Sequence, residues 1–196
     1  MALFARLKDE TGPDHRRLEQ ELDLTSDGLT LDRYRERLQA FHGFVSVYEP
    51  ALESGAPASW IPLMQARRRC HWLRQDLLTL GLGPGDIDDL PCNQRLPPMQ
   101  SLAERLGCMY VMEGSTLGGL IIAKQLQRCL PDHAQAACRY FTSHGSDTAR
   151  NWHEFRRQMD NALLGAEHDE AIAAARGCFE SLLAWFIATR HHVACA

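Results

Sequence analysis

The stretch best suited to an unusual chemical task is a helical pattern at 106–124 that glycine interrupts. Hydrophobic residues recur there at steps of three and four, yet Gly114, Gly118 and Gly119 fall within the run, with Ser115 among them. Each glycine inside a helix costs roughly 1 kcal/mol relative to alanine, so three of them require a compensating gain. Positions without side chains allow either a second helix or a flat, bulky ligand to approach the backbone. The third glycine and the polar side chains beside it favour a ligand, without identifying it.

Histidine is the second residue type that could carry chemistry. The sequence has nine histidines, and His15 differs from the others because it lies on the apolar side of the helix predicted over 2–22. Such a histidine is either a core residue or an iron ligand, since a neutral imidazole on an apolar wall is how proteins hold haem iron. The residues alone leave both interpretations open. Glu-x-x-His pairs, HExxH motifs, phosphate loops and nucleophile elbows are absent from the sequence, which argues against dimetal, nucleotide-binding and hydrolase chemistry.

The composition is that of an ordinary soluble globular chain of 196 residues, with 45% hydrophobic and 23% charged residues. No linker divides it, so we expect one domain over 1–196. A net charge of −4 gives no electrostatic case for a nucleic acid or membrane partner. No apolar run reaches the roughly 18 residues that span a bilayer, and the N-terminus lacks a signal-peptide pattern. Seven cysteines without a CxxC pair predict free thiols in a reducing cytoplasm.

The elements that must position these residues are helices, because no stretch keeps the period of two that marks a strand. We expect helices over 2–22, 31–53, 63–80, 102–130, 133–141, 148–164 and 168–190. Thr30 is the predicted N-cap of the second helix, and Ser101 with Glu104 marks the start of the long glycine helix. Pro13 should kink the first helix or begin a new turn.

Three further expectations concern the loop before the glycine helix, a run of arginines and a cysteine. Residues 81–98 are rich in Gly, Pro and Asp, which is typical of a loop. The run Arg67-Arg68-Arg69 should form a solvated face. Cys108, inside the glycine helix, should be a small core residue.

Two separated stretches resemble haem oxygenases. Leu7–Glu19 resembles their first helix, in which a histidine follows a threonine by about four residues and precedes a glutamate by four. Tyr110–Gly119 resembles their glycine-rich distal helix, in the bacterial form with Glu-Gly-Ser. Weaker similarity at Trp152–Met159 and Phe179–Phe186 extends the resemblance over nearly the whole chain. The similarity is greatest to the bacterial enzymes that supply biliverdin to bacteriophytochromes.

The resemblance implies an all-α fold: a single-domain multihelical bundle with haem sandwiched between a proximal and a distal helix. It implies that His15 is the proximal iron ligand. It also implies that the distal wall, where catalysis takes place, is made by Gly114, Ser115, Gly118 and Gly119. The other implied haem-binding residues are Lys8 and Arg156 near the propionates, and Tyr110 and Phe186 in the pocket, with Arg150 and Arg157 as less certain neighbours.

The reaction implied by the resemblance is cleavage of haem to biliverdin, ferrous iron and CO, with O2 and external electrons. The implied partners are haem and an electron-donor protein such as a ferredoxin or flavin reductase. The purpose is either release of iron or supply of biliverdin as a chromophore, and in the second case a bacteriophytochrome is a further partner. Two alternatives have the same fold: a haem- or tetrapyrrole-binding protein without turnover, and a non-haem member that acts on another metabolite or uses a dimetal site.

One departure from the family concerns the polar side of the distal helix. Mammalian-type members carry an aspartate directly after the first distal glycine, where it organises ordered water. This chain has Ser115 at that position, as bacterial members do. The group that orders the water is therefore open between Ser115, Thr116 and a more distant polar side chain.

Overall fold

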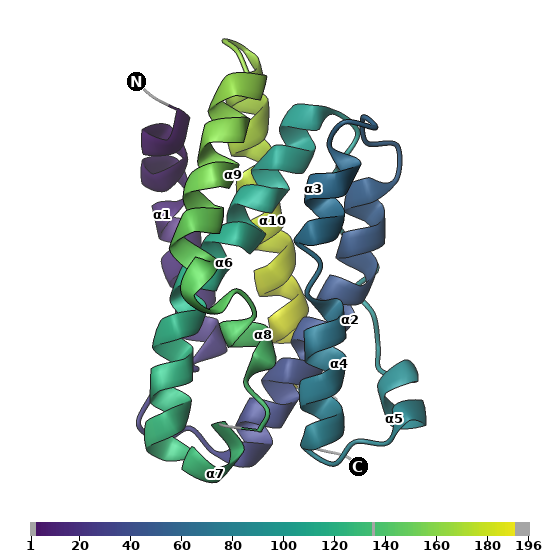
Figure 1. Cartoon of the computed structure of the whole chain (residues 1–196), viewed down its shortest axis with the longest axis vertical. Helices are drawn as coiled ribbons and strands as arrows, with labels where there is room; N and C mark the ends of the chain where they lie inside the picture. The colour runs from purple at the N-terminus through teal and green to yellow at the C-terminus, as the bar shows by residue number, and fades with distance from the viewer. Residues whose placement is uncertain (1–2, 135, 191–196) are drawn as a thin grey trace.

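The computed structural model shows a bundle of helices (Figure 1) and describes residues 3–134 and 136–190. The long helices are α1 (Leu3–Leu22), α2 (Leu31–Glu53), α6 (Leu102–Cys129), α9 (Thr148–Ala162) and α10 (Glu167–Thr189). The short ones are α3 (Ile61–Ala66), α4 (Cys70–Thr79), α5 (Pro84–Asp88), α7 (Pro131–Ala134), α8 (Arg139–Thr142) and the 3-10 turn η1 (Gly145–Asp147). The described residues contain no strand, which confirms the all-α prediction.

The centre of the bundle is the crossing of α6 and α10, which Figure 1 shows one behind the other with α1 along one edge. Glycine makes this crossing close: a Cβ at Gly107 would collide with the carbonyl oxygen of Ala171 on α10. Cys108 and Cys178 are fully buried beside it. The prediction that Cys108 is a small core residue is confirmed.

By length and composition, α6 and α10 are each apolar enough to cross a membrane, although the sequence contains no unbroken apolar run of that length. In the most apolar window of each helix, 50% and 44% of the residues are buried inside the bundle. Central helices of soluble proteins have the same property, because they contact protein on most sides. Their apolar character therefore follows from their place in this core.

Local sequence accounts for where the two best-predicted helices begin. Thr30 Oγ1 accepts a hydrogen bond from the Arg33 N–H at 3.3 Å, so it is the N-cap of α2. Ser101 Oγ accepts from the Glu104 N–H at 3.1 Å, and the Glu104 carboxylate accepts from the Ser101 N–H at 3.2 Å. This reciprocal capping box starts α6. The helix expected to kink at Pro13 is a single helix, α1.

Four predictions about the shorter segments are wrong. The helix expected over 63–80 is broken into α3 and α4, the region 81–98 contains α5, and the helix expected over 133–141 is two short helices, α7 and α8. The arginine run is not a solvated face, because the side chains of Arg67 and Arg69 are buried. The cause is Glu49 on α2, whose carboxylate accepts the N–H groups of Arg69 at 2.5 Å and Cys70 at 3.0 Å. These bonds cap α4 from another helix, which no local pattern predicts.

Candidate functional site

The proximal candidate, His15, lies on the surface of α1. Its side chain is 54% exposed, and its Nε2 lies 3.5 Å from a carboxylate oxygen of Glu19, one turn along the helix. The ring also packs beside Phe179 of α10, with 5.7 Å between the ring centroids. An imidazole with this exposure is not a core histidine, so the interpretation of His15 as a core residue is excluded. About half of the imidazole side chain is therefore open to a ligand, while Phe179 packs beside the ring.

One side of α6 forms an open face, made of Gly114, Leu117, Gly118 and Ile121 at helical spacing. A Cβ added at Gly118 would meet no atom within 4 Å, and one at Gly114 would only touch the Trp152 ring at 3.7 Å. Leu117 and Ile121 are 38% and 62% exposed. Bare backbone between two exposed aliphatic side chains is a surface on which a flat apolar ligand can lie.

Gly119 meets different surroundings from Gly118. A Cβ at Gly119 would lie 2.6 Å from the carbonyl oxygen of Phe141, on α8. This glycine is required by close packing of α8 on α6, as Gly107 is by α10. The two neighbouring glycines therefore have different surroundings: Gly118 faces open space, whereas Gly119 accommodates neighbouring protein.

Aromatic rings close one end of the site, where α1, α6 and α9 meet. Tyr110 is half-buried there, with ring centroids 5.8 Å from Phe4 and 5.7 Å from Trp152. The Arg156 guanidinium lies over the Phe4 ring at 4.7 Å, and its Nε has no hydrogen-bond partner in the described part of the chain. Burial raises the pKa of Tyr110. The arrangement offers a cation with unused donors beside an apolar wall, and an exposed Lys8 lies on the same α1.

Phe186 is the predicted pocket residue that the structure keeps away from the surface. It is fully buried in α10, 4.8 Å from the Phe41 ring of α2, with the Arg37 guanidinium 5.9 Å from its centroid. In this structure Phe186 supports the core between α2 and α10 and does not line the open face.

The polar edge of α6 is built around Ser115. Its Oγ donates to the Met112 carbonyl oxygen at 2.6 Å and accepts from Arg69 Nη2 at 3.2 Å. Arg69 Nη2 also donates to the same carbonyl at 2.6 Å, and the guanidinium lies 4.8 Å over the Tyr140 ring. Thr116, by contrast, is buried and donates its hydroxyl to the Glu113 carbonyl oxygen at 2.6 Å. Of the two hydroxyls considered from sequence, only Ser115 is exposed at the edge of the site.

Reasoning from sequence missed two residues, one at this edge and one on the other side of the same helix. Arg69 was assigned to a solvated face, and only the break between α3 and α4 brings it to Ser115. Glu113 was named only within the glycine motif, although an acid on an otherwise apolar helix face is a signal in itself. Burial raises the pKa of Glu113, and its carboxylate lies 3.7 Å from Arg67 Nε.

Among residues 3–134 and 136–190, no group of three or more His, Cys, Asp or Glu side chains is placed to hold a bare metal ion. A haem iron needs only one protein ligand, because the porphyrin supplies the other nitrogens. The exposed imidazole of His15, the open apolar face of α6 and the guanidinium of Arg156 are groups of the kinds that bind haem iron, porphyrin and propionates.

Comparison with known proteins gives a consistent result. The family model described as "Heme oxygenase" matches residues 1–188. A curated heme oxygenase of Xanthomonas campestris pv. campestris is 34% identical over 154 residues, covering 76% of this chain and 85% of the relative. The heme oxygenase PigA of Pseudomonas aeruginosa is 29% identical over 169 residues, covering 86% and 82% of the two chains.

The fold agrees with these matches. A crystal structure of the NO- and CO-bound heme oxygenase of Neisseria meningitidis superposes with a TM-score of 0.80, covering 100% of this chain and 96% of that chain at 21% identity. The expected all-α haem-oxygenase fold is therefore confirmed. With a family model spanning nearly its whole length, a curated relative above 30% identity and the matching bundle, the chain belongs to the haem oxygenase family, a family of haem-degrading enzymes.

Proposed function

We propose that this enzyme cleaves haem to biliverdin, ferrous iron and CO, with O2 and electrons from a separate donor protein. The observation that carries the proposal is the open face of α6, where Gly118 lies bare between the exposed side chains of Leu117 and Ile121. Adjacent exposed aliphatic side chains on a central helix mark a ligand site rather than ordinary surface. In a family that degrades haem, the ligand that suits this face is the porphyrin.

His15 is the proposed proximal ligand. Its exposed ring can present a nitrogen to iron, and the Glu19 carboxylate lies beside the ring, 3.5 Å from Nε2. Haem is the substrate, and its iron supplies the site at which dioxygen is reduced. A neutral imidazole donates less electron density than a thiolate, which leaves oxygen available for attack on the porphyrin.

The distal side is proposed to act through shape and polarity. Gly118 lets the helix backbone lie close to a bound gas molecule, which restricts the directions in which that molecule can tilt. Ser115 uses its proton on the Met112 carbonyl, so its remaining lone pair faces outward only as an acceptor. Arg69 has donors beyond those used on Ser115 and Met112. We therefore assign the ordering of distal water to Arg69 and Ser115 together, and not to Thr116.

The end of the site where α1 and α9 meet is proposed to bind the propionates. Arg156 has an unpartnered Nε, Lys8 is exposed on α1, and Arg156 and Tyr110 both lie against the Phe4 ring. Carboxylates take short, charge-assisted hydrogen bonds from such groups. The same contacts would set the in-plane orientation of haem, and hence which meso carbon is attacked.

The remaining parts of the proposal concern context. A ferredoxin or flavin reductase is the proposed electron donor, and biliverdin supply to a bacteriophytochrome or release of iron the proposed purpose. Six cysteines of the described chain are free thiols, which supports a cytoplasmic location.

The proposal is tested by titrating the purified protein with haemin and then adding reductant in air. We expect a one-to-one complex with a Soret band that decays to the absorption of biliverdin. A complex that never turns over would leave a haem-binding protein, and failure to bind would overturn the site.

His15→Ala should abolish the histidine-ligated spectrum and turnover while the helical circular dichroism is unchanged, because the side chain is exposed. His71→Ala, at another exposed histidine, is the matched control and should leave the spectrum as in the wild type. Retention of the spectrum in His15→Ala would assign the ligand to another residue.

A further inference from the structure

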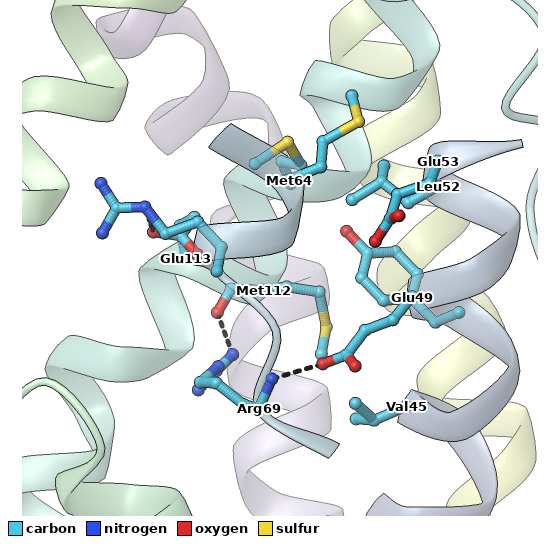
Figure 2. Close-up of a pocket in the computed structure, with 11 residues that line it drawn as sticks. Val45, Glu49, Leu52, Glu53, Met64, Arg69, Met112 and Glu113 are labelled. Carbon is cyan, nitrogen blue, oxygen red and sulfur yellow. Dashed lines mark hydrogen bonds and ion pairs between the residues drawn. The ribbon is translucent and has the colours of Figure 1, made fainter. Parts of the chain in front are cut away.

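A small cavity lies between α2, α3 and α6 (Figure 2). Met109 lines it, and Met109 and Gly118 are nine residues apart, two and a half turns, which places them on opposite sides of the helix. The cavity is about 20 Å³, room for about one water molecule. It is therefore separate from the open face of α6.

Five charged side chains line this cavity, and one of them, Glu53, pairs with Arg68. We call the other four, Glu49, Arg67, Arg69 and Glu113, the inner charge cluster. Glu113 and Arg67 have side-chain exposures of only 5% and 8%, Arg69 is buried, and Glu49 is half-buried. The two cations balance the two carboxylates in charge, and removal of Glu113 leaves buried positive charge without its counterion.

The cluster is incompletely hydrogen-bonded. Arg67 Nε lies 3.7 Å from the Glu113 carboxylate, beyond hydrogen-bond distance. Arg67 Nε and the buried hydroxyl of Tyr48 have no hydrogen-bond partner among the described residues. Glu113 therefore acts on Arg67 mainly as a charge, and a charge at this distance acts over the whole cluster.

The inner charge cluster connects directly to the polar edge of the haem site. Arg67 and Arg69 lie in the three-residue link between α3 and α4, and Glu49 holds this link through the Arg69 N–H. Figure 2 shows the Arg69 side chain extending from the link to the Met112 carbonyl. The same Nη2 reaches Ser115 at 3.2 Å, so whatever fixes the link also fixes the donor on Ser115.

We propose that Glu113 is a positioning residue for the haem reaction: its carboxylate, on the back of the distal helix, holds the Arg67–Arg69 link in place and thereby fixes Arg69 on Ser115. It also balances the positive charge of the link, so it sets the electrostatic potential on the polar side of the site. This inference rests on the proposed function for its catalytic consequence. The positioning itself is a property of the protein without haem.

The groups that face Glu113 come from two elements. From α2 they are Tyr48, Glu49 and Glu53, and from the link they are Arg67 and Arg69. His144, after α8, is near both arginines and is held neutral, because burial and these two cations lower its pKa to about 4. The local charge above pH 6 is therefore set by the carboxylates and arginines.

The first experiment measures hydrogen exchange of the Arg69 guanidinium by NMR in the protein without haem, with Arg69→Lys to assign the signals. Glu113→Gln keeps the side-chain shape and removes the charge, and we expect exchange to accelerate by about tenfold or more as the Arg69–Ser115 contact opens. Glu36→Gln is the matched control. Glu36 lies on the same α2 but thirteen residues, or about 20 Å, from Glu49, and it does not line the cavity, so exchange of Arg69 should stay as in the wild type.

The second experiment follows the visible spectrum of the haemin complex as pH rises and records the midpoint of the change from acid to alkaline form. Loss of one negative charge about 10 Å away, across a helix, should lower this midpoint by about 0.5–1 pH unit in Glu113→Gln. Glu36→Gln should leave it unchanged. The double variant Arg67→Gln/Glu113→Gln, which removes a balanced pair, should restore the midpoint toward the wild-type value, and it replaces the single variant if that fails to fold.

Unchanged exchange of Arg69 in Glu113→Gln, or equal midpoints in Glu113→Gln and Glu36→Gln, would overturn the inference. A midpoint in the double variant as low as in the single variant would overturn its electrostatic basis. If the wild-type protein forms no haemin complex, the proposed function fails, and the exchange measurement still decides whether Glu113 positions Arg69.

Discussion

Gly118 and Gly119 are neighbours in sequence, but the structure leaves space beside one and packs protein against the other. A Cβ at Gly118 would meet nothing within 4 Å, whereas one at Gly119 would lie 2.6 Å from the Phe141 carbonyl oxygen. The position of Phe141 is itself held, because the buried carboxylate of Asp76 accepts the N–H groups of Arg139 at 3.0 Å and Tyr140 at 2.9 Å at the start of α8. The packed side of α6 thus fixes the helix from which the open side presents bare backbone.

The comparison teaches that a glycine-rich helix need not be flexible. Tight packing of Gly119 and Gly107 against neighbouring backbone removes the freedom that glycine would otherwise give. A rigid support is what a site needs if it is to hold a substrate in one orientation. The predictions below test whether the two sides respond as differently as their surroundings require.

The largest effect should come from the packed side. Gly119→Ala places a methyl group against a backbone carbonyl that no rotamer change can move, so it should lower the free energy of unfolding by about 2–3 kcal/mol. Urea unfolding of the protein without haem, followed by circular dichroism, measures this change. Stability equal to that of the wild type would mean that α8 can retreat from α6, and that the packed side is not rigid.

The polar edge should show an intermediate, pH-dependent effect. The pKa of His144 is lowered from 6.5 to about 4 by burial and by the charges of Arg69 and Arg67. The unfolded chain then binds more protons than the folded chain between these values, so stability falls as pH drops from about 6.5 to about 4. His144 keeps some exposure, so we discount the shift to a loss of about 1–2 kcal/mol.

His144→Gln removes this titration. Urea unfolding at pH 7 and pH 4.5 should therefore show a smaller difference in the variant than in the wild type. Parallel behaviour of the two proteins would show that His144 is not held neutral by the arginines, and would weaken the electrostatic link between the inner charge cluster and the polar edge.

The smallest effect should come from the open side, and with the opposite sign. Gly118→Ala has space for its methyl group and a better helix former in place of glycine, so it should stabilise the protein without haem by up to about 1 kcal/mol. The same urea titration gives the value. Destabilisation similar to that in Gly119→Ala would show that the open face is covered by protein in solution.

Predictions from the sequence were correct where a feature depends only on residues close together in the chain. The caps at Thr30 and Ser101 depend on residues three positions apart, and the stripes of long helices depend on a repeating period, so both were predicted correctly. The family resemblance rested on two motifs whose residues the fold places on α1 and α6. The roles of the individual site residues, from His15 to Gly119, remain predictions.

Where the prediction failed, a distant residue decided the outcome. Glu49 on α2 ends one helix and starts the next at Arg69, and a buried pair with Glu113 draws in Arg67, so a run of three arginines became an internal structure rather than a solvated face. Neither partner lies within 15 residues of the run in sequence. A run of charges in the sequence therefore does not show whether another helix of the folded protein supplies a counterion.

The sequence by itself determined that the chain is helical, where its long helices begin, and which short motifs bring it into its family, because these follow from spacing within a few residues. Only the tertiary structure decided that Gly118 is open while Gly119 is packed, that Phe186 lies in the core, and that Arg69 reaches Ser115. The physical reason is that burial and charge pairing are properties of surfaces that meet in space. Identical residue types side by side in sequence acquire different roles when different neighbours reach them.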